Sequence, residues 1–294
     1  MSTEAMSPRY LGIDTWSTGD ILDAMIEGQL AAVAAARAAL PALGAAAEAA
    51  VPRLRRGGRL IYVGAGTSGR IAIQDGAELP PTFDWPVDRL VLLMAGGDRA
   101  ILRSVEGAED DEEAAAAAVA AQRIGPDDVV IALAASGTTR YTRRVQALAR
   151  AAGALTIAVA NNKAAPLLAE AERPVLIETG AEVIAGSTRM KAGTAQKVAL
   201  NLLSTLVMIR LGRVHDGLMV DMLAMNRKLV DRAGRMVRHL TGCDEASARA
   251  ALDRSNGHVK TAVLVVRGLA PEEARAAIER AGGSLRGALA ALKA

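Results

Sequence analysis

Short apolar runs alternate with helical stretches along most of the chain, and this alternation constrains the fold more than any other feature. The runs that predict buried strands lie at residues 59–63, 90–94, 129–134, 155–159 and 175–177. Helical patterns separate them, so each strand must reach the next by a crossover, which is how parallel strands are joined. We therefore expect an α/β fold with a mostly parallel sheet between layers of helices.

The regions flanking the sheet are expected to be helical. Helices are predicted at residues 20–37 and from there to 54, and a long one over 187–211. A helical pattern also follows the first strand, from about Ser68 to Pro80-Pro81.

After residue 213 the pattern changes. A connecting helix is predicted over 216–240, and glycine-rich breaks divide residues 241–294 into four short helices. We divide the chain into an N-terminal helical segment (1–50), a sheet domain (51–214) and a connecting helix with a C-terminal helical bundle (215–294).

Charge and cysteine content exclude several classes of protein. The 35 basic and 32 acidic residues nearly balance, so nothing argues for a nucleic-acid partner. A single cysteine, Cys243, excludes an internal disulfide, and three histidines without a second cysteine argue against a zinc site. No signal-peptide pattern and no apolar run of about 18 residues is present. We expect a cytoplasmic protein with no membrane partner.

A glycine-rich turn, Gly64–Arg70, follows the first predicted strand directly and opens a helix. Glycine lets the backbone approach an anion, and Gly66, Thr67 and Ser68 would supply N–H and hydroxyl donors at the helix N-terminus. The spacing of Gly64, Gly66 and Gly69 also fits a dinucleotide-binding fold, but such a fold requires an acidic residue after the next strand. Ala95-Gly96-Gly97-Asp98 stands there and makes a poor ribose site.

A second hydroxyl-rich turn follows the third predicted strand, with Ser136, Gly137, Thr138 and Thr139. Helix capping would explain either turn alone, because Ser and Thr are common N-caps. Two such turns on neighbouring strands could instead converge on one phosphate and its sugar. We favour a sugar-phosphate ligand.

The two turns resemble the phosphate-sugar loops of the sugar isomerase (SIS) domain family. Three further stretches resemble the N-acetylmuramic acid 6-phosphate etherase family. They are residues 75–82, 105–110 and above all 186–197 (GSTRMKAGTAQK). The likeness covers nearly the whole chain, including the C-terminal helices from Thr241, which are similar to a small UBA-like bundle. It implies a three-layer SIS fold with that bundle appended.

The resemblance implies a lyase of amino-sugar metabolism in cell-wall recycling. Such an enzyme cleaves D-lactate from carbon 3 of the sugar and leaves N-acetylglucosamine 6-phosphate. Elimination needs a base for the carbon 2 proton and an acid for the departing oxygen, with no cofactor or metal. By the resemblance Glu78 is the acid, and Glu109 is the second catalytic glutamate, to which we assign the base role. Five other acidic residues lie close to Glu109 in the sequence and could be mistaken for the catalytic glutamate: Glu106, Asp110, Asp111, Glu112 and Glu113.

Helix geometry raises a difficulty for both glutamates. Glu78 follows Ser68 by ten residues, which is about 15 Å along an unbroken helix, and Glu109 is similarly displaced from Gly97. Unless the helices bend back, neither reaches a ligand in its own loop. A two-fold dimer would bring one subunit's glutamate to the other's loop, so we expect a homodimer.

Basic and hydroxyl groups at 187–191 are further candidates. Ser187 would bind substrate, and Arg189 or Lys191 could neutralise the phosphate or the lactyl carboxylate, although both could equally be surface residues. Arg70 is ambiguous in the same way.

The family pattern is not matched everywhere. Ala77 and Leu79 replace the family's common Ser and Cys beside the first glutamate, which bears on the fit of the lactyl group. The rival readings are a sugar-phosphate isomerase, which would share both loops, and a non-catalytic sensor like the glucokinase regulatory protein.

Overall fold

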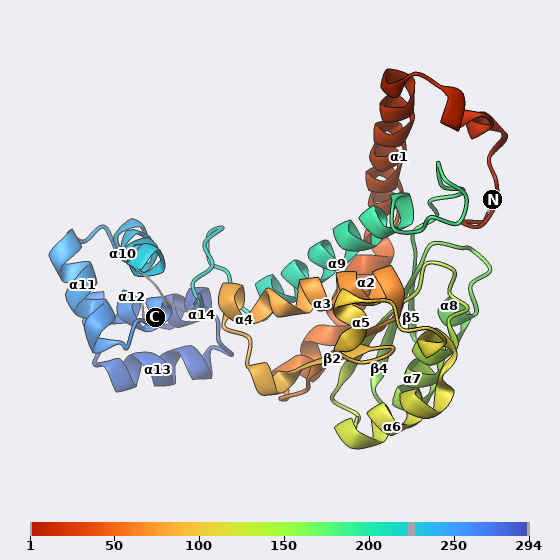
Figure 1. The fold of residues 1–294 in the computed structure, drawn as a ribbon. Helices are drawn as coiled ribbons and strands as arrows, with labels where there is room; N and C mark the ends of the chain where they lie inside the picture. Colours follow the sequence, from red (N-terminus) through yellow and green to blue (C-terminus); the bar gives the residue numbers. More distant parts are fainter. Residues whose placement is uncertain (1, 223–226, 293–294) are drawn as a thin grey trace. The chain divides into compact units, whose positions relative to one another are not determined.

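The computed structural model describes residues 2–222 and 227–292. One parallel sheet has the strand order β2-β1-β3-β4-β5 (Figure 1). The strands are β1 (Leu60–Gly64), β2 (Leu90–Met94), β3 (Val129–Leu133), β4 (Leu155–Ala160) and β5 (Arg173–Leu176). All five overlap the predicted apolar runs, although β5 was expected at 175–177 and lies at Arg173–Leu176. The order reverses at β1, because the chain leaves β1 for β2 on one side and returns to β3 on the other.

Helices cover both faces of the sheet, which confirms the α/β prediction. One face contacts α7 (Arg140–Ala151) and α8 (Pro166–Glu170), with α6 (Glu112–Gln122) packed on α7, and the other contacts α2 (Leu40–Arg55) and α3 (Gly66–Ala77).

The long helix α9 (Lys191–Arg210) packs against α3. A Cβ added at Gly193 would lie 3.4 Å from Ile71 Cδ1 and 3.5 Å from Thr67 Cγ2. By length and composition α9 could cross a membrane, but 56% of its most apolar window is buried inside the protein, so the helix is only weak evidence for a membrane span. Its buried positions include Ala192, Ala195 and Ala199.

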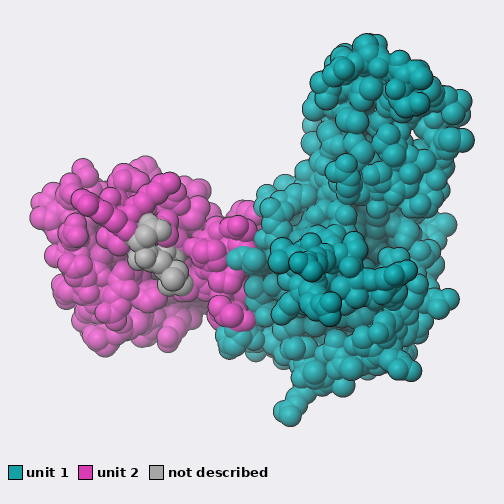
Figure 2. Space-filling view, in the orientation of Figure 1, with its two compact units in different colours: residues 1–77, 88–204 teal, residues 78–87, 205–294 magenta. Residues whose placement is uncertain are grey.

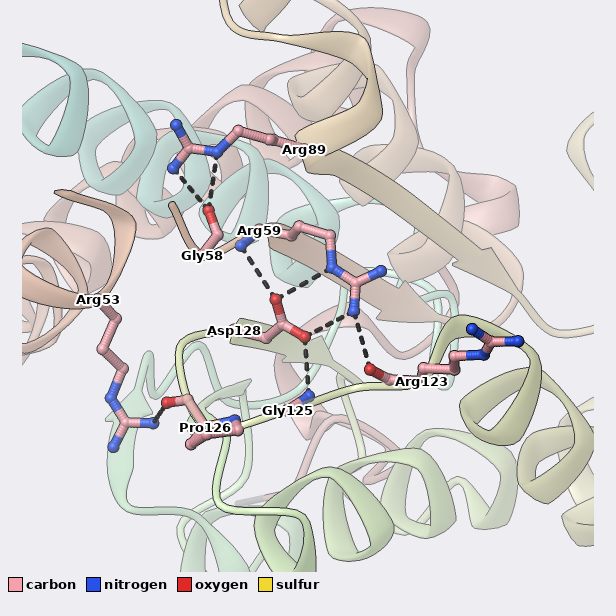
Figure 3. A network of polar contacts seen from close by, with 8 residues as sticks. All are labelled: Arg53, Gly58, Arg59, Arg89, Arg123, Gly125, Pro126 and Asp128. Atoms are coloured by element: carbon pink, nitrogen blue, oxygen red, sulfur yellow. Dashed lines mark hydrogen bonds and ion pairs between the residues drawn. The ribbon is translucent and has the colours of Figure 1, made fainter. Parts of the chain in front are cut away.

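Arginines tie together the amino-terminal edge of the sheet (Figure 3). Asp128, which precedes β3, accepts hydrogen bonds from Arg59 N (3.0 Å), Arg59 Nε (3.0 Å), Arg59 Nη2 (2.7 Å) and Gly125 N (2.9 Å). Arg59 precedes β1, and Arg89, just before β2, donates to the carbonyl of Gly58. These bonds fix the starts of the three strands and leave the carboxyl ends to carry other side chains.

The chain divides into two compact units, coloured in Figure 2. The first comprises residues 1–77 and 88–204, and the second comprises 78–87 and 205–294. Within the second unit a core of buried residues joins α10 (Arg227–Thr241), α11 (Glu245–Arg254), α12 (Val259–Val266), α13 (Pro271–Arg280) and α14 (Leu285–Ala291). The four short C-terminal helices are thus confirmed. The division of domains expected at 50/51 and 214/215 stays a prediction.

Two expected helices start later than predicted. Residues 216–222 form turns and α10 is described from Arg227, while 223–226 lie outside the described residues. His215 and Leu218 pair instead in an isolated β-bridge, with Gly217 in the left-handed region at φ +76°. The α9 helix begins at Lys191 rather than at Ser187, because Gly186 (φ +74°) opens a run of turns.

The helix after β1 also ends earlier than predicted. It stops at Ala77, and Pro80 and Pro81 belong to a separate short helix, α4 (Leu79–Phe83). Proline lacks an N–H but is tolerated in the first turn of a helix, where that group has no partner in any case.

Candidate active site

The two hydroxyl-rich turns begin at neighbouring strand ends. β1 pairs with β3, and Gly64 lies opposite Leu133 at the carboxyl end of the pair. This is the point where strand order reverses, and in open parallel sheets ligands bind in the crevice there. The expected adjacency of the two turns is therefore confirmed.

Two glycines shape the first turn in different ways. Gly66 has φ +53° with open space around it, so glycine is favoured there by the backbone conformation and not by close packing. A Cβ on Gly69 would lie 2.3 Å from Met94 Sδ and 2.8 Å from Gly64 O, so Gly69 meets a need for close packing. Because α3 begins at Gly66, the N–H groups of its first turn lie at the sheet edge, next to half-buried Thr67 and buried Ser68.

Capping accounts for only part of the second turn. Ser136 Oγ accepts hydrogen bonds from Thr138 N (3.2 Å) and Thr138 Oγ1 (2.9 Å), which stabilises the turn itself. Thr139 occupies the N-cap of α7, yet its side chain makes no capping hydrogen bond. Gly137 has φ +72° and a Cβ there would lie 2.2 Å from the Cβ of Ala165. The Thr139 hydroxyl is thus not explained by helix capping.

Glu109 lies beside the first turn in the same unit. The helix after β2, α5 (Arg99–Leu102), is short, and the chain then turns at Gly107 (φ +70°) into a 3-10 turn at Ala108–Asp110. A cleft of about 310 Å³ is lined by Gly66, Arg103 and Glu109 among others. The displacement expected for Glu109 is wrong, because the chain bends back to the sheet edge.

The same segment also lies beside the second turn. Asp110 Oδ1 is 4.0 Å from Arg140 Nε, and Arg140 directly follows Thr139. Such an exposed ion pair adds little stability, but it shows that the two segments are neighbours. Glu109 is therefore on the segment that runs between the two turns.

Glu78 has a different setting. It is exposed, occupies the N-cap of α4 without a side-chain capping bond, and belongs to the second unit. Its chain neighbour Ala77 ends α3, about 16 Å along the helix axis from Gly66. The displacement predicted for the first glutamate along α3 is confirmed.

The run at 186–197 lies near the first turn, because Gly193 packs against Thr67 and Ile71. Ser187 is half-buried and Arg189 is exposed. Lys191 is 8% exposed, and its Nζ donates to Ala181 O at 2.5 Å. Burial lowers the pKa of Lys191, opposed by the charge of Glu182.

A buried carboxylate starts α9. Glu182 accepts hydrogen bonds from Lys191 N (2.9 Å) and Ala192 N (2.8 Å), which satisfies two N–H groups at the helix N-terminus. This contact fixes the helix start at Lys191. Among the described residues no group of three His, Cys, Asp or Glu side chains is arranged to hold a metal ion.

Sequence reasoning missed residues that brace the sheet edge. Thr3, which is fully buried, donates through its N–H to Asn162 Oδ1 (2.9 Å), and Asn162 Nδ2 donates to Thr3 Oγ1 (3.0 Å) and Ala135 O (3.2 Å). Gly186 N donates to Thr3 O at 3.3 Å. The signal was available in part, because Asn161-Asn162 is a polar pair at a strand's carboxyl end. Arg70 donates to Ile101 O (2.8 Å) and Ala100 O (2.9 Å), so it stabilises α5.

Comparison with known proteins agrees with this geometry. An N-acetylmuramic acid 6-phosphate etherase from Deinococcus radiodurans is 55% identical over 273 residues, covering 92% of this chain and 90% of that protein. The chain belongs to the N-acetylmuramic acid 6-phosphate etherase family. Etherases from Mycolicibacterium smegmatis (45% identical, covering 99% of this chain and 98% of that one) and Erwinia tasmaniensis (44%, 98% and 94%) are also similar.

Domain-family matches identify the sheet region as an SIS domain. Residues 108–206 match the SIS domain, and residues 43–147 match the N-terminal SIS domain of glucokinase regulatory protein. A phosphoheptose isomerase from Francisella tularensis is a structural neighbour at 22% identity and TM-score 0.49, covering 66% of this etherase-family chain and 98% of that one. The SIS fold and the family resemblance read from the sequence are confirmed.

Proposed function

We propose that this chain cleaves the D-lactyl ether of N-acetylmuramic acid 6-phosphate, giving N-acetylglucosamine 6-phosphate and D-lactate. Membership of the etherase family over nearly the whole chain supports the reaction. The observation that carries its location is that Gly66 and Glu109 line one cleft at the carboxyl ends of β1 and β2.

The phosphate is held between the two turns. Thr67, Ser68, Thr138 and Thr139 supply hydroxyls, and the N-termini of α3 and α7 supply N–H groups and favourable dipoles. Gly66 and Gly137, both with positive φ, let the backbone come close to the anion. Ser136 holds Thr138 in place through the bonds within its turn.

The reaction runs on the open-chain aldehyde of the sugar. A base removes the proton on carbon 2, and the bonding pair forms the carbon 2–carbon 3 double bond as the carbon 3–oxygen bond breaks. An acid protonates the departing oxygen, and D-lactate leaves. Water then adds across the double bond, its hydroxyl to carbon 3 and its proton to carbon 2, which balances the reaction without an oxidant or a metal.

Glu109 is the base, because it shares the cleft with the first turn of the same subunit. Glu78 is the acid, and its exposed carboxyl is not used in capping α4.

A second copy of the chain completes the site by supplying Glu78, since that residue follows the end of α3 farthest from the loop. The helix α1 (Thr18–Ala38) offers a surface for such a homodimer. Its small residues face inward, with Ala24, Gly28, Ala32 and Ala36 buried. Its large apolar residues face outward: Leu22, Ile26, Leu30 and Val33 are 49–66% exposed. An outward apolar stripe of this kind is typical of an interface.

Ser187 and Arg189 also contact the substrate. Exposed Arg189 neutralises the lactyl carboxylate. Buried Lys191 lies behind the loop and attracts the anionic substrate through its positive charge. The cytoplasm stays the proposed compartment, because a sugar phosphate is an anion that does not cross a bilayer.

The rival functions are separated by one assay. A sugar-phosphate isomerase would interconvert ketose and aldose without releasing lactate, and a sensor would bind sugar phosphate without turnover. Purified protein is incubated with N-acetylmuramic acid 6-phosphate and D-lactate is measured, with Glu78→Ala and Glu109→Ala alongside. We expect release by the wild type alone, and absence of lactate from the wild type would overturn the proposal.

A further inference from the structure

The segment that carries Glu78 belongs to the C-terminal unit, although it lies in the middle of the sheet domain's sequence. Residues 78–87 form one compact unit with residues 205–294. Leu79, the first residue of α4, and Trp85, which follows the helix, are each 2% exposed, so both ends of the segment are packed against the protein.

Arg213 fastens the end of this segment. Its Nη1 donates to Phe83 O (2.5 Å) and Asp84 O (2.8 Å), where α4 ends, and its Cζ lies 5.3 Å from the ring centroid of Trp85. The last carbonyls of a helix have no partner within the helix and carry its negative pole, so a guanidinium stabilises them well.

The other side of Arg213 is fixed to the bundle. Asp221 Oδ2 lies 3.7 Å from Arg213 Nη1 and 2.6 Å from Lys260 Nζ, and Lys260 also donates to Gly283 O at 2.7 Å. Lys260 is on α12 and is 6% exposed. Charges of alternating sign therefore connect the C-terminal helices to α4.

Gly212 strengthens this connection. It has φ +79°, and a Cβ there would lie 3.1 Å from Gly283 O and 3.1 Å from Ser284 Cα. The turn bearing Arg213 is thus seated directly on the turn between α13 and α14.

Glu78 lies at the start of α4, and Arg213 binds the carbonyls at the end of the same helix. Glu78 O accepts the N–H of Thr82 (3.3 Å), and Asp84 N donates to Pro80 O (2.9 Å), so Glu78 shares the backbone bonding of α4. A shift at the Arg213 end is therefore passed on to the Glu78 backbone, about 8 Å away along the helix.

We propose that the C-terminal bundle is a positioning scaffold for Glu78 and that Arg213 is its positioning residue. This proposal rests on the proposed function, in which Glu78 protonates the departing oxygen. Arg213 touches no reacting atom. It sets where the acid stands during cleavage of the carbon 3–oxygen bond.

The test separates the two halves of the reaction. In D₂O, proton exchange at carbon 2 of remaining substrate reports the base step, and D-lactate release reports the acid step. Arg213→Ala is expected to lower kcat for lactate release by about 10- to 100-fold, as misplacement of a catalytic group by about 1 Å does. KM and the exchange rate should stay within about threefold. Arg213→Lys, which keeps a charged donor, should restore part of the release rate.

Arg254→Ala, an exposed arginine on α11, is the matched control and should leave both rates unchanged. The proposal is overturned if Arg213→Ala releases lactate within about twofold of wild type, or if release and exchange fall by the same factor, as general damage would cause. Should Arg213→Ala not fold, Asp221→Asn keeps both carbonyl bonds and is expected to slow release alone; a folded Asp221→Asn protein with wild-type release overturns the proposal. Failure of the proposed function is seen separately, as wild-type protein that forms no lactate.

Discussion

Glu109 and Gly66 line the same cleft of the first unit, although β2 and a short helix separate them in the chain. The chain returns from α5 through Gly107 to set the carboxylate beside the glycine turn. This pairing places a candidate base next to a candidate phosphate cradle without help from another subunit.

Glu109→Gln tests the base role directly. We expect both carbon 2 exchange and lactate release to fall by about 10²- to 10⁴-fold, because the amide cannot take the proton. NMR in D₂O measures both. Glu113→Gln, on an exposed glutamate in the first turn of α6, is the control. Exchange at wild-type rate in Glu109→Gln would assign the base elsewhere.

Thr139→Ala separates ligand binding from helix capping. Since Thr139 makes no capping bond, its loss should change the free energy of unfolding by less than about 0.5 kcal/mol. KM should rise about tenfold, as for a lost hydrogen bond to a charged group. Asp244→Ala removes a real cap, which accepts from Ser247 N at 2.7 Å, and should cost about 1 kcal/mol with KM unchanged. The reverse pattern would mean that Thr139 is structural.

Leu30→Glu tests the dimer surface on α1. A charge in the centre of the outward stripe should dissociate the homodimer in analytical ultracentrifugation and lower lactate release, because burying an unpaired charge is costly. Ala31→Glu adds the same charge to an exposed position off the stripe and should leave the dimer intact. A fully active monomer would refute the shared site.

Asp128 makes stability depend on pH. Burial acts to raise the pKa of Asp128, but the hydrogen bonds from Arg59 and from Gly125 N outweigh it and lower that pKa below 3.8. A lowered pKa in the folded state means stability that is present above about pH 4 and lost as pH falls through the folded pKa. Asp128→Asn should therefore cost about 1–3 kcal/mol at pH 7, with the difference shrinking in acid.

Urea unfolding at several pH values measures this effect. Asp127→Asn is the control, because Asp127 is 46% exposed in its pair with Arg56, and exposed pairs contribute about 0–1 kcal/mol. An Asp128→Asn protein as stable as wild type at pH 7 would contradict the prediction.

The sheet and the bundle were predictable because their signals are local. Apolar runs mark the strands, and glycine turns such as Gly282-Gly283 mark the ends of the short helices. The hydroxyls after the first and third strands suggested that the two turns lie on neighbouring strands, and the pairing of Gly64 with Leu133 confirms this.

What could not be predicted depends on distant contacts. The start of α9 is set by the Glu182 carboxylate, which no pattern near Lys191 shows. Glu109 is brought back to the sheet edge by turns, and turns leave no periodic pattern in the sequence. The attachment of Glu78 to the C-terminal unit depends on Arg213, which is distant in the sequence. The role of each site residue stays a prediction until the variants are measured.

The place of β1 between β2 and β3 has a consequence for biosynthesis. One edge of β1 can pair as soon as β2 leaves the ribosome, but its other edge stays open until β3 is made, and an open strand edge invites aggregation. A nascent chain lacking residues 129–139 has only one of the two turns. A ligand that needs both turns therefore meets its complete site only after residues 129–139 have been synthesised.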